Sequence, residues 1–323
     1  MSADNAEIRS YHGQRVLKEP VWTWEIPLYF FTGGLAGGSA GLAYLSELRG
    51  AEVLARRAWT AALIGIGVSP VLLTSDLGKP LRFLNMLRLF KVTSPMSVGS
   101  WILVSSGAST ALGGASALTG LFPRAGRLAR PAAALIGLPL STYTGALVAN
   151  TAIPAWHEAR RLLPFLFGSG AALSAGAVAV ASTPPAHAAP ARRLALAGAA
   201  SELLFKEVME RALGEHGEPY RTGAAARFGH LTRGCTVAGA ALLVARGATS
   251  RAAAIGAGAL LCAGALAERW SVYRAGFQSA SDPKYVVGPQ RRRVERGERR
   301  GAARGQAEVA PGHPELGSPA NLG

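Results

Sequence analysis

Charged side chains are almost absent from long stretches of this 323-residue chain, and this segregation constrains its fold more than any other feature. Only 16% of the residues are charged, whereas charged residues make up roughly a quarter of an ordinary globular chain. A helix of about 20 apolar residues crosses the hydrocarbon core of a bilayer, which is about 30 Å thick. The sequence therefore predicts membrane-spanning segments separated by polar loops rather than a soluble protein.

The apolar segments are continuous runs, which favours an all-α, polytopic membrane helix bundle over the alternating strands of a membrane barrel. Their many glycine and alanine residues allow helix backbones to approach closely. The sixth segment is the least apolar. About eight transmembrane helices are predicted, at residues 26–45, 58–77, 98–118, 131–153, 163–182, 194–209, 234–248 and 252–272.

These segments divide the chain into four parts. A polar N-terminal segment covers 1–21, a first four-helix half covers 22–156, a second four-helix half covers 157–278, and a basic tail covers 279–323. The tail is rich in Arg, Gly and Pro, so we expect it to be disordered. It could be attracted to anionic lipid headgroups or dock to an acidic partner subunit. Its basic run has no interleaved aromatic residues, which argues against nucleic-acid binding.

The distribution of basic residues predicts the topology. An even number of spans places both termini on the same side, and the segments on that side carry more than twice as many Lys and Arg residues as those on the other. By the positive-inside rule, both termini of this multi-pass protein are expected in the cytoplasm.

Cysteine and histidine usage limits the cofactors that the chain can hold. Cys235 and Cys262 are the only cysteines, which excludes a disulfide framework and a cysteine-ligated iron–sulfur cluster within this chain. None of the six histidines falls in the middle of a predicted span, so we expect no haem and no metal site. A redox role would then require a diffusible carrier, such as a quinone, beside a cofactor of a partner. We predict no catalytic residues within the chain itself.

The loop between the second and third spans combines basic and apolar residues. Asp76 ends the second span, and Leu84, Leu87 and Phe90 would share one face of a helix. This pattern predicts a short interfacial helix or a surface for docking a partner. The candidate docking residues are Lys79, Arg82, Phe83, Arg88 and Lys91.

Four motifs give the chain a resemblance to the NrfD-type integral membrane subunits, which include the polysulfide reductase membrane anchor. The resemblance is strong over about 19–156 and extends to the remaining spans by their number and composition. The motifs are WTWEIPLYF at 22–30, DLGKPLRF at 76–83, TSPMSVGSW at 93–101, and YTG at 143–145 with PAW at 154–156.

The resemblance implies a subunit of an oxidoreductase complex in the bacterial cytoplasmic membrane. Such subunits bind a quinone or quinol (menaquinone or ubiquinone) and exchange electrons with a ferredoxin-like iron–sulfur subunit, usually together with a molybdopterin catalytic subunit. Their quinone pocket lies in the first four helices, near the docking side. Tyr143 matches a pocket tyrosine, whereas Tyr29 and Ile26 stand where a polysulfide-reductase-like relative has a histidine and an asparagine.

The predicted spans are compatible with such a pocket. Tyr29, Asp76, Tyr143 and Asn150 would all lie in the half of the membrane that contains the termini. A tyrosine hydroxyl can donate a hydrogen bond to a quinone carbonyl, and a carboxylate at the membrane edge can relay protons. Tyr29 could instead belong to an aromatic belt, and Asp76 could simply pair with Lys79 or Arg82.

The sixth span contains ionisable residues within the predicted membrane region. Glu202, Lys206 and Glu210 are spaced four residues apart, so they could form ion pairs along one helix face or a functional site. Glu268 and Arg269 lie near the predicted end of the eighth span, where we expect them to snorkel to the surface.

Two other classes of protein remain open. A secondary transporter or channel would explain the glycine-rich spans, their internal prolines and the intramembrane charges, although no inverted repeat is evident. The other alternative is a structural anchor that binds no quinone.

Overall fold

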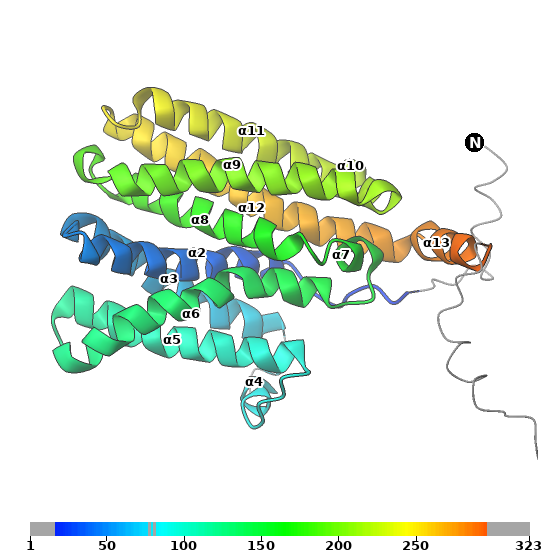
Figure 1. Ribbon diagram of the computed structural model, residues 1–323, viewed down its shortest axis with the longest axis horizontal. Coiled ribbons are helices and arrows are strands. Elements are labelled where there is room, and N and C mark those ends of the chain that lie inside the picture. Colours follow the sequence, from blue (N-terminus) through cyan, green and yellow to red (C-terminus); the bar gives the residue numbers. More distant parts are fainter. Residues whose placement is uncertain (1–16, 77–78, 80–81, 296–323) are drawn as a thin grey trace, which may run out of the picture.

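Eight long helices form one bundle in the computed structural model, which describes residues 17–76, 79 and 82–295 (Figure 1). The described chain contains no strand, and the all-α class is confirmed. By length and composition, α3, α6, α8, α11 and α12 are apolar enough to cross a membrane, so a total of eight spans remains a prediction. The long helices are α2 (Glu25–Leu48), α3 (Glu52–Asp76), α5 (Pro95–Thr119), α6 (Pro123–Ala149), α8 (Leu163–Ser182), α9 (Ala189–Ala212), α11 (Gly223–Arg246) and α12 (Arg251–Ser281).

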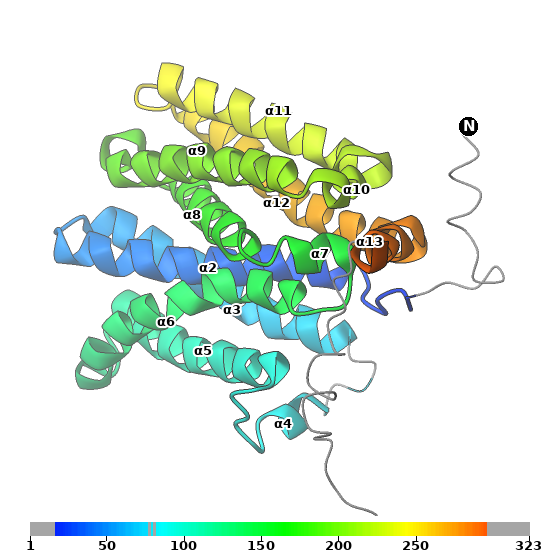
Figure 2. The same cartoon turned by 45° about the vertical axis from the view of Figure 1, so that its right-hand side comes forward.

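The two ends of the bundle differ. We call the end where α2 begins and α12 finishes the termini end, and the end where α2 passes into α3 the loop end. Four shorter helices gather at the termini end in both views (Figures 1 and 2). They are α4 (Arg82–Met86), α7 (Pro154–Glu158), α10 (Glu218–Arg221) and α13 (Lys284–Glu295), and the 3-10 turns are η1 (Pro185–His187) and η2 (Gly214–Gly217).

Local sequence signals explain several helix boundaries. The Ser94 side chain accepts a hydrogen bond from the N–H of Ser97 at the start of α5, and Pro95 occupies the first turn, where a missing N–H is tolerated. α5 ends at Thr119 and is followed by Gly120, whose φ of 76° suits glycine. Ser250 caps α12 in the same way as Ser94 caps α5.

α2 is the central helix of the bundle. It packs against α3 and α6 of the first half and against α8 of the second half. A Cβ atom added at Gly37 would overlap the backbone of Gly137 in α6, so these two helices approach as closely as their backbones allow. Glycine thus provides the close contact that drives helix association in lipid.

Two expectations about local structure are wrong. We expected disorder from residue 279, but α12 continues to Ser281 and α13 extends the described chain to Glu295; the rest of the predicted tail lies outside the described residues. We also expected Leu84, Leu87 and Phe90 on one helical face. α4 ends at Met86, because the following segment turns toward the start of α5, so Leu87 and Phe90 lie outside the helix.

Candidate functional site

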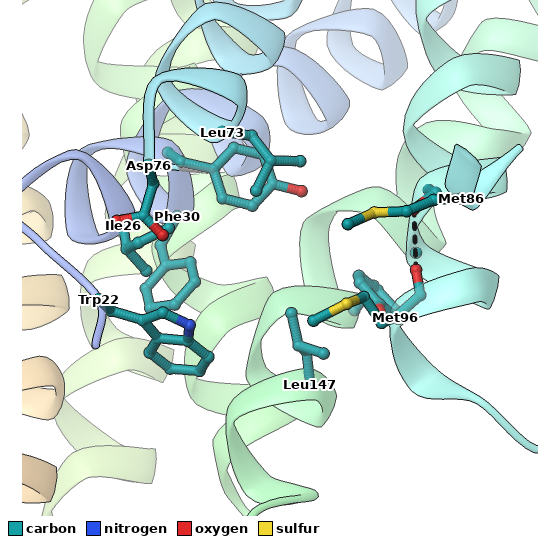
Figure 3. Close-up of a pocket in the computed structure, with 12 residues that line it drawn as sticks. Trp22, Ile26, Phe30, Leu73, Asp76, Met86, Met96 and Leu147 are labelled. Carbon is teal, nitrogen blue, oxygen red and sulfur yellow. Dashed lines mark hydrogen bonds between the residues drawn. The ribbon is translucent and has the colours of Figure 1, made fainter. Parts of the chain in front are cut away.

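A small pocket lies at the termini end of the first half. Its volume is about 80 Å³, and α2, α3, α5 and α6 supply most of its walls. Met86 and Met96 extend into it from one side, opposite Trp22, Ile26 and Asp76 (Figure 3). The lining residues are Trp22, Ile26, Tyr29, Phe30, Leu73, Asp76, Met86, Met96, Gly99, Ser100, Tyr143 and Leu147.

Asp76 is fixed at the rim of this pocket by Thr23. One carboxylate oxygen of Asp76 accepts a hydrogen bond from the Thr23 backbone N–H (3.0 Å) and lies 2.8 Å from the Thr23 hydroxyl, which also contacts the Glu25 carboxylate. Asp76 is the last residue of α3, and Thr23 lies two residues before the start of α2. These bonds orient the acid at the edge of the predicted membrane region, next to the apolar lining.

Tyr143 crosses the pocket from α6 to the start of α5. Its hydroxyl donates a hydrogen bond to the Pro95 carbonyl. The ring lies directly over Gly99, where an added Cβ atom would overlap the Tyr143 ring. The absence of a side chain at Gly99 therefore makes room for the tyrosine.

Tyr29 faces the interior of the protein. Its side chain is only 3% exposed, so Tyr29 does not belong to an aromatic belt at the level of the lipid headgroups. Its hydroxyl makes no hydrogen bond to any described residue, which leaves a donor in a largely apolar wall. Trp24, at 57% exposed, is the aromatic residue here that suits such a belt.

An aromatic wall closes the pocket toward the second half. The Trp22 ring stacks on Trp156, with centroids 5.4 Å apart, and it meets Phe30 edge to face, with centroids 6.5 Å apart. Phe30 also meets Phe167 of α8 at 5.5 Å. Tyr273 donates a hydrogen bond to the Trp22 carbonyl (2.6 Å), so α12 helps to position this wall.

The structure brings together three of the four residues predicted for the pocket. Asn150 follows the last residue of α6, is exposed, and is not among the lining residues. The methionines and Ser100 were not predicted. Ser100 donates to the Met96 carbonyl (2.9 Å) and lies 3.5 Å from the Met86 sulfur, contacts for which a single sequence gives no signal.

The predicted docking residues surround the same end of the bundle. Lys79, Arg88 and Lys91 are exposed, Phe83 packs against the core, and the side chain of Arg82 lies outside the described residues. The loop is fixed to α5 by Ser97, whose hydroxyl accepts from the Lys91 N–H (3.1 Å) and donates to the Leu89 carbonyl (3.0 Å). Leu84, Leu89 and Phe90 are 58%, 71% and 56% exposed, so apolar and basic groups share this surface.

A second group of functional candidates is a buried ionic cluster between α9 and α12. Lys206, 1% exposed, pairs with Glu268 at 2.8 Å and with Glu210 at 3.2 Å. Glu210 also accepts a hydrogen bond from Arg233 of α11 (2.8 Å). The predicted pairing of Lys206 with Glu210 is thus present, and a second carboxylate from α12 completes it.

Glu202 and Arg269 form the deeper part of this cluster, and here two expectations fail. Glu202 makes no ion pair with Lys206; its carboxylate lies beside Arg269, and an added Cβ at Gly170 would overlap both side chains. Glu268 and Arg269 do not snorkel, because α12 continues to Ser281 and leaves them 0% and 1% exposed in mid-helix. Arg269 instead donates to the Phe167 carbonyl (2.8 Å) and lies 4.1 Å from the centre of its ring.

Comparison with known proteins gives one family. The family model NrfD_2, described as polysulfide reductase, matches residues 11–281, which include the pocket and the ionic cluster. None of the curated proteins gives a significant match.

Proposed function

The chain belongs to the NrfD_2 polysulfide reductase family, and we propose that it binds a quinone or quinol as the membrane anchor of an oxidoreductase complex. The observation that supports this most is the convergence of Tyr29, Asp76 and Tyr143 on one apolar pocket. Ligand pockets of this kind combine apolar walls with a few oriented polar groups.

The chemistry of the lining fits a quinone head group. Aromatic and aliphatic side chains would contact its ring, and Tyr29 offers a hydroxyl donor for one of its carbonyls. The pocket volume of about 80 Å³ is below the roughly 300 Å³ at the lower end for ligand pockets, so the pocket must widen on binding. Met86 and Met96 are suited to this, because methionine has three rotatable bonds and repacks readily.

A bound quinone would supply redox chemistry that takes up or releases two electrons and two protons. The chain would contribute orientation and proton transfer. Tyr29 would donate a hydrogen bond to the ligand, and Tyr143 would do so after leaving the Pro95 carbonyl. Asp76 lies at the rim, where a carboxylate can exchange protons with water.

Fluorescence of Trp22, which lines the pocket, provides a direct test. We expect a soluble menaquinone or ubiquinone analogue to quench it in the purified protein, and the W22F variant to lose that part of the quenching. The Y29F and Y143F variants should bind the analogue roughly three- to tenfold more weakly, the usual effect of losing one hydrogen bond. Y44F, which alters a tyrosine of α2 outside the pocket, is the matched control. Unchanged binding in the Y29F/Y143F double variant would remove the pocket assignment.

We further propose that a ferredoxin-like iron–sulfur subunit docks at the termini end and that a molybdopterin subunit completes the complex. The exposed surface of Lys79, Arg88, Lys91 and Phe90 adjoins the pocket, which would bring a partner's cluster near a bound quinone. The charge bias of the sequence supports a cytoplasmic position for this surface.

Copurification tests the partner. We expect the native chain to be purified with an iron–sulfur protein, and the R88E/K91E variant to lose it. The R124E/R127E variant reverses two exposed arginines at the loop end and should retain the partner. Recovery of the chain alone with solute transport in vesicles would instead support the transporter, and a stable complex without quinone would support the structural anchor. Labelling of a cysteine introduced at Lys79 from outside intact cells would overturn the orientation.

A further inference from the structure

A larger groove opens on the lipid-facing side of the bundle, away from the pocket. It lies at the loop end among α2, α6, α8 and α9, and its volume is about 690 Å³. Gly41 leaves open space in its lining, and the exposed side chains of Leu45 and Leu138 border it. It shares Thr142, Gly168, Ala172 and Ala197 with a second hollow of about 310 Å³, so the two form one continuous groove.

The length of this groove matches one leaflet of a bilayer. It runs along α9 from Arg193 to Phe205, a separation of twelve positions that corresponds to about 18 Å of helix. Half of the hydrocarbon core is about 15 Å. A ligand that fills the groove would therefore reach from the membrane surface to the bilayer centre.

Two arginines stand at the surface end of the groove. Arg49 follows the last residue of α2, and Arg193 lies in the first turns of α9. Both are exposed, and neither forms an ion pair or a side-chain hydrogen bond with any described residue. Two other arginines at this end, in contrast, have partners within the protein. Arg130 pairs with Glu47, and Arg192 donates a hydrogen bond to the Pro185 carbonyl.

From this arrangement we infer that the groove binds an anionic phospholipid, with its phosphate at Arg49 and Arg193 and its acyl chains along the groove. The charge of the two free guanidinium groups complements the headgroup, and arginine binds phosphate through paired N–H groups. The depth of the groove offers little to a polar ligand. The Ser46 and Ser141 hydroxyls, which line it, already donate to carbonyls of their own helices at 2.7 and 2.8 Å.

Gly41 allows the groove to be filled without disturbing the protein. A Cβ atom added there meets nothing within 4 Å, so a phenylalanine side chain can project into the space for the lipid. Gly67 of α3 is equally free of neighbours but lies outside the groove. G41F and G67F are therefore a matched pair that adds the same side chain to two open helix surfaces.

Native mass spectrometry of the purified full-length protein tests this inference, with phosphatidylglycerol and phosphatidylcholine of identical chains as probes. We expect preferential retention of phosphatidylglycerol. The R49A/R193A variant should bind it about 30-fold more weakly, given the usual contribution of basic residues near anionic lipid. The R56A/R57A variant, which removes two exposed arginines of α3 outside the groove, should bind it as the native protein does.

G41F should lose the retained lipid while G67F keeps it, and gel filtration should show both variants folded. Equal retention of the two lipids, or undiminished phosphatidylglycerol in a folded G41F protein, would overturn the inference. Extraction of a quinone rather than phospholipid from the native protein, lost in G41F, would also overturn it and assign the groove to a different ligand.

Discussion

The backbone N–H of Thr23 donates a hydrogen bond to a carboxylate oxygen of Asp76, 53 positions further along the chain, and the Thr23 hydroxyl is shared between the carboxylates of Asp76 and Glu25. This contact connects the segment that leads into α2 with the last residue of α3. It also fixes the only carboxylate among the residues that line the pocket. The position of the proposed proton-exchanging group therefore depends on a residue outside the pocket.

Replacing Thr23 by valine should loosen this connection. The T23V variant keeps the shape of the side chain and the backbone N–H but loses the hydroxyl donor. We expect a loss of about 1 kcal/mol in the free energy of unfolding, which corresponds to a fall of roughly 2 °C in the unfolding midpoint. Thermal unfolding of the purified protein measures this. T60V removes a hydroxyl that bonds within its own helix and should have a smaller effect; equal effects would contradict the role of Thr23.

A methyl group at Gly99 should displace Tyr143. Because the added Cβ would overlap the tyrosine ring, we expect G99A to destabilise the protein by about 1–3 kcal/mol and to weaken binding of a quinone analogue. G107A is the control in the same helix, since its Cβ would meet only Ile66 at an ordinary 3.8 Å. Trp22 quenching and thermal unfolding measure the two effects. A G99A variant that behaves like G107A would show that the tyrosine can move freely.

Shortening Met86 should make the pocket easier to enter. The M86A variant removes a side chain that the ligand would otherwise have to displace, so we expect several-fold tighter binding of the quinone analogue. L84A, an exposed position of the same short helix, should leave binding unchanged. Titration of Trp22 fluorescence compares the three proteins. Weaker binding by M86A would mean that Met86 contacts the ligand and does not obstruct it.

The positions of the helices along the chain were largely predictable, because the thickness of the bilayer sets the length of each apolar segment. Residues 163–182 were predicted as a span, and α8 covers the same residues. The C-terminal end of α12 was not predicted equally well: the span was expected to end at residue 272, whereas the helix continues to Ser281. In the sequence, the charges of Glu268 and Arg269 are typical of a helix end. In the structure Glu268 pairs with Lys206 of α9 and Arg269 donates to the Phe167 carbonyl of α8, and the helix continues past both.

Which way a side chain faces was less predictable than its depth. Tyr29, Asp76 and Tyr143 were expected at one end of the bundle, and all three line the pocket. Asn150 was expected in the same half of the membrane but nearer its surface; it lies beyond the last turn of α6, is exposed and does not line the pocket. Depth follows from counting residues along a helix, whereas direction depends on the neighbours, such as Gly99 and Thr23, that come from distant parts of the chain.

Breaking the buried ionic cluster should lower the free energy of unfolding more than breaking an exposed ion pair. Removing the Lys206 charge in K206M would leave Glu210 and Glu268 as two buried carboxylates with one fewer cation. We expect a loss of about 3–5 kcal/mol in the free energy of unfolding, the usual result of breaking a buried pair. R211M removes an exposed partner of Glu207 and should cost less than about 1 kcal/mol.

A compensating variant distinguishes the loss of charge balance from the loss of packing. K206M/E210Q/E268Q removes the lysine together with both carboxylate charges, so it should recover much of the stability lost in K206M, because neutral buried groups are less costly than unpaired buried charges. Thermal unfolding of the four proteins under the same conditions gives the comparison. If the triple variant were no more stable than K206M, the contribution of Lys206 would be its packing between α9 and α12, and the electrostatic account of the cluster would be wrong.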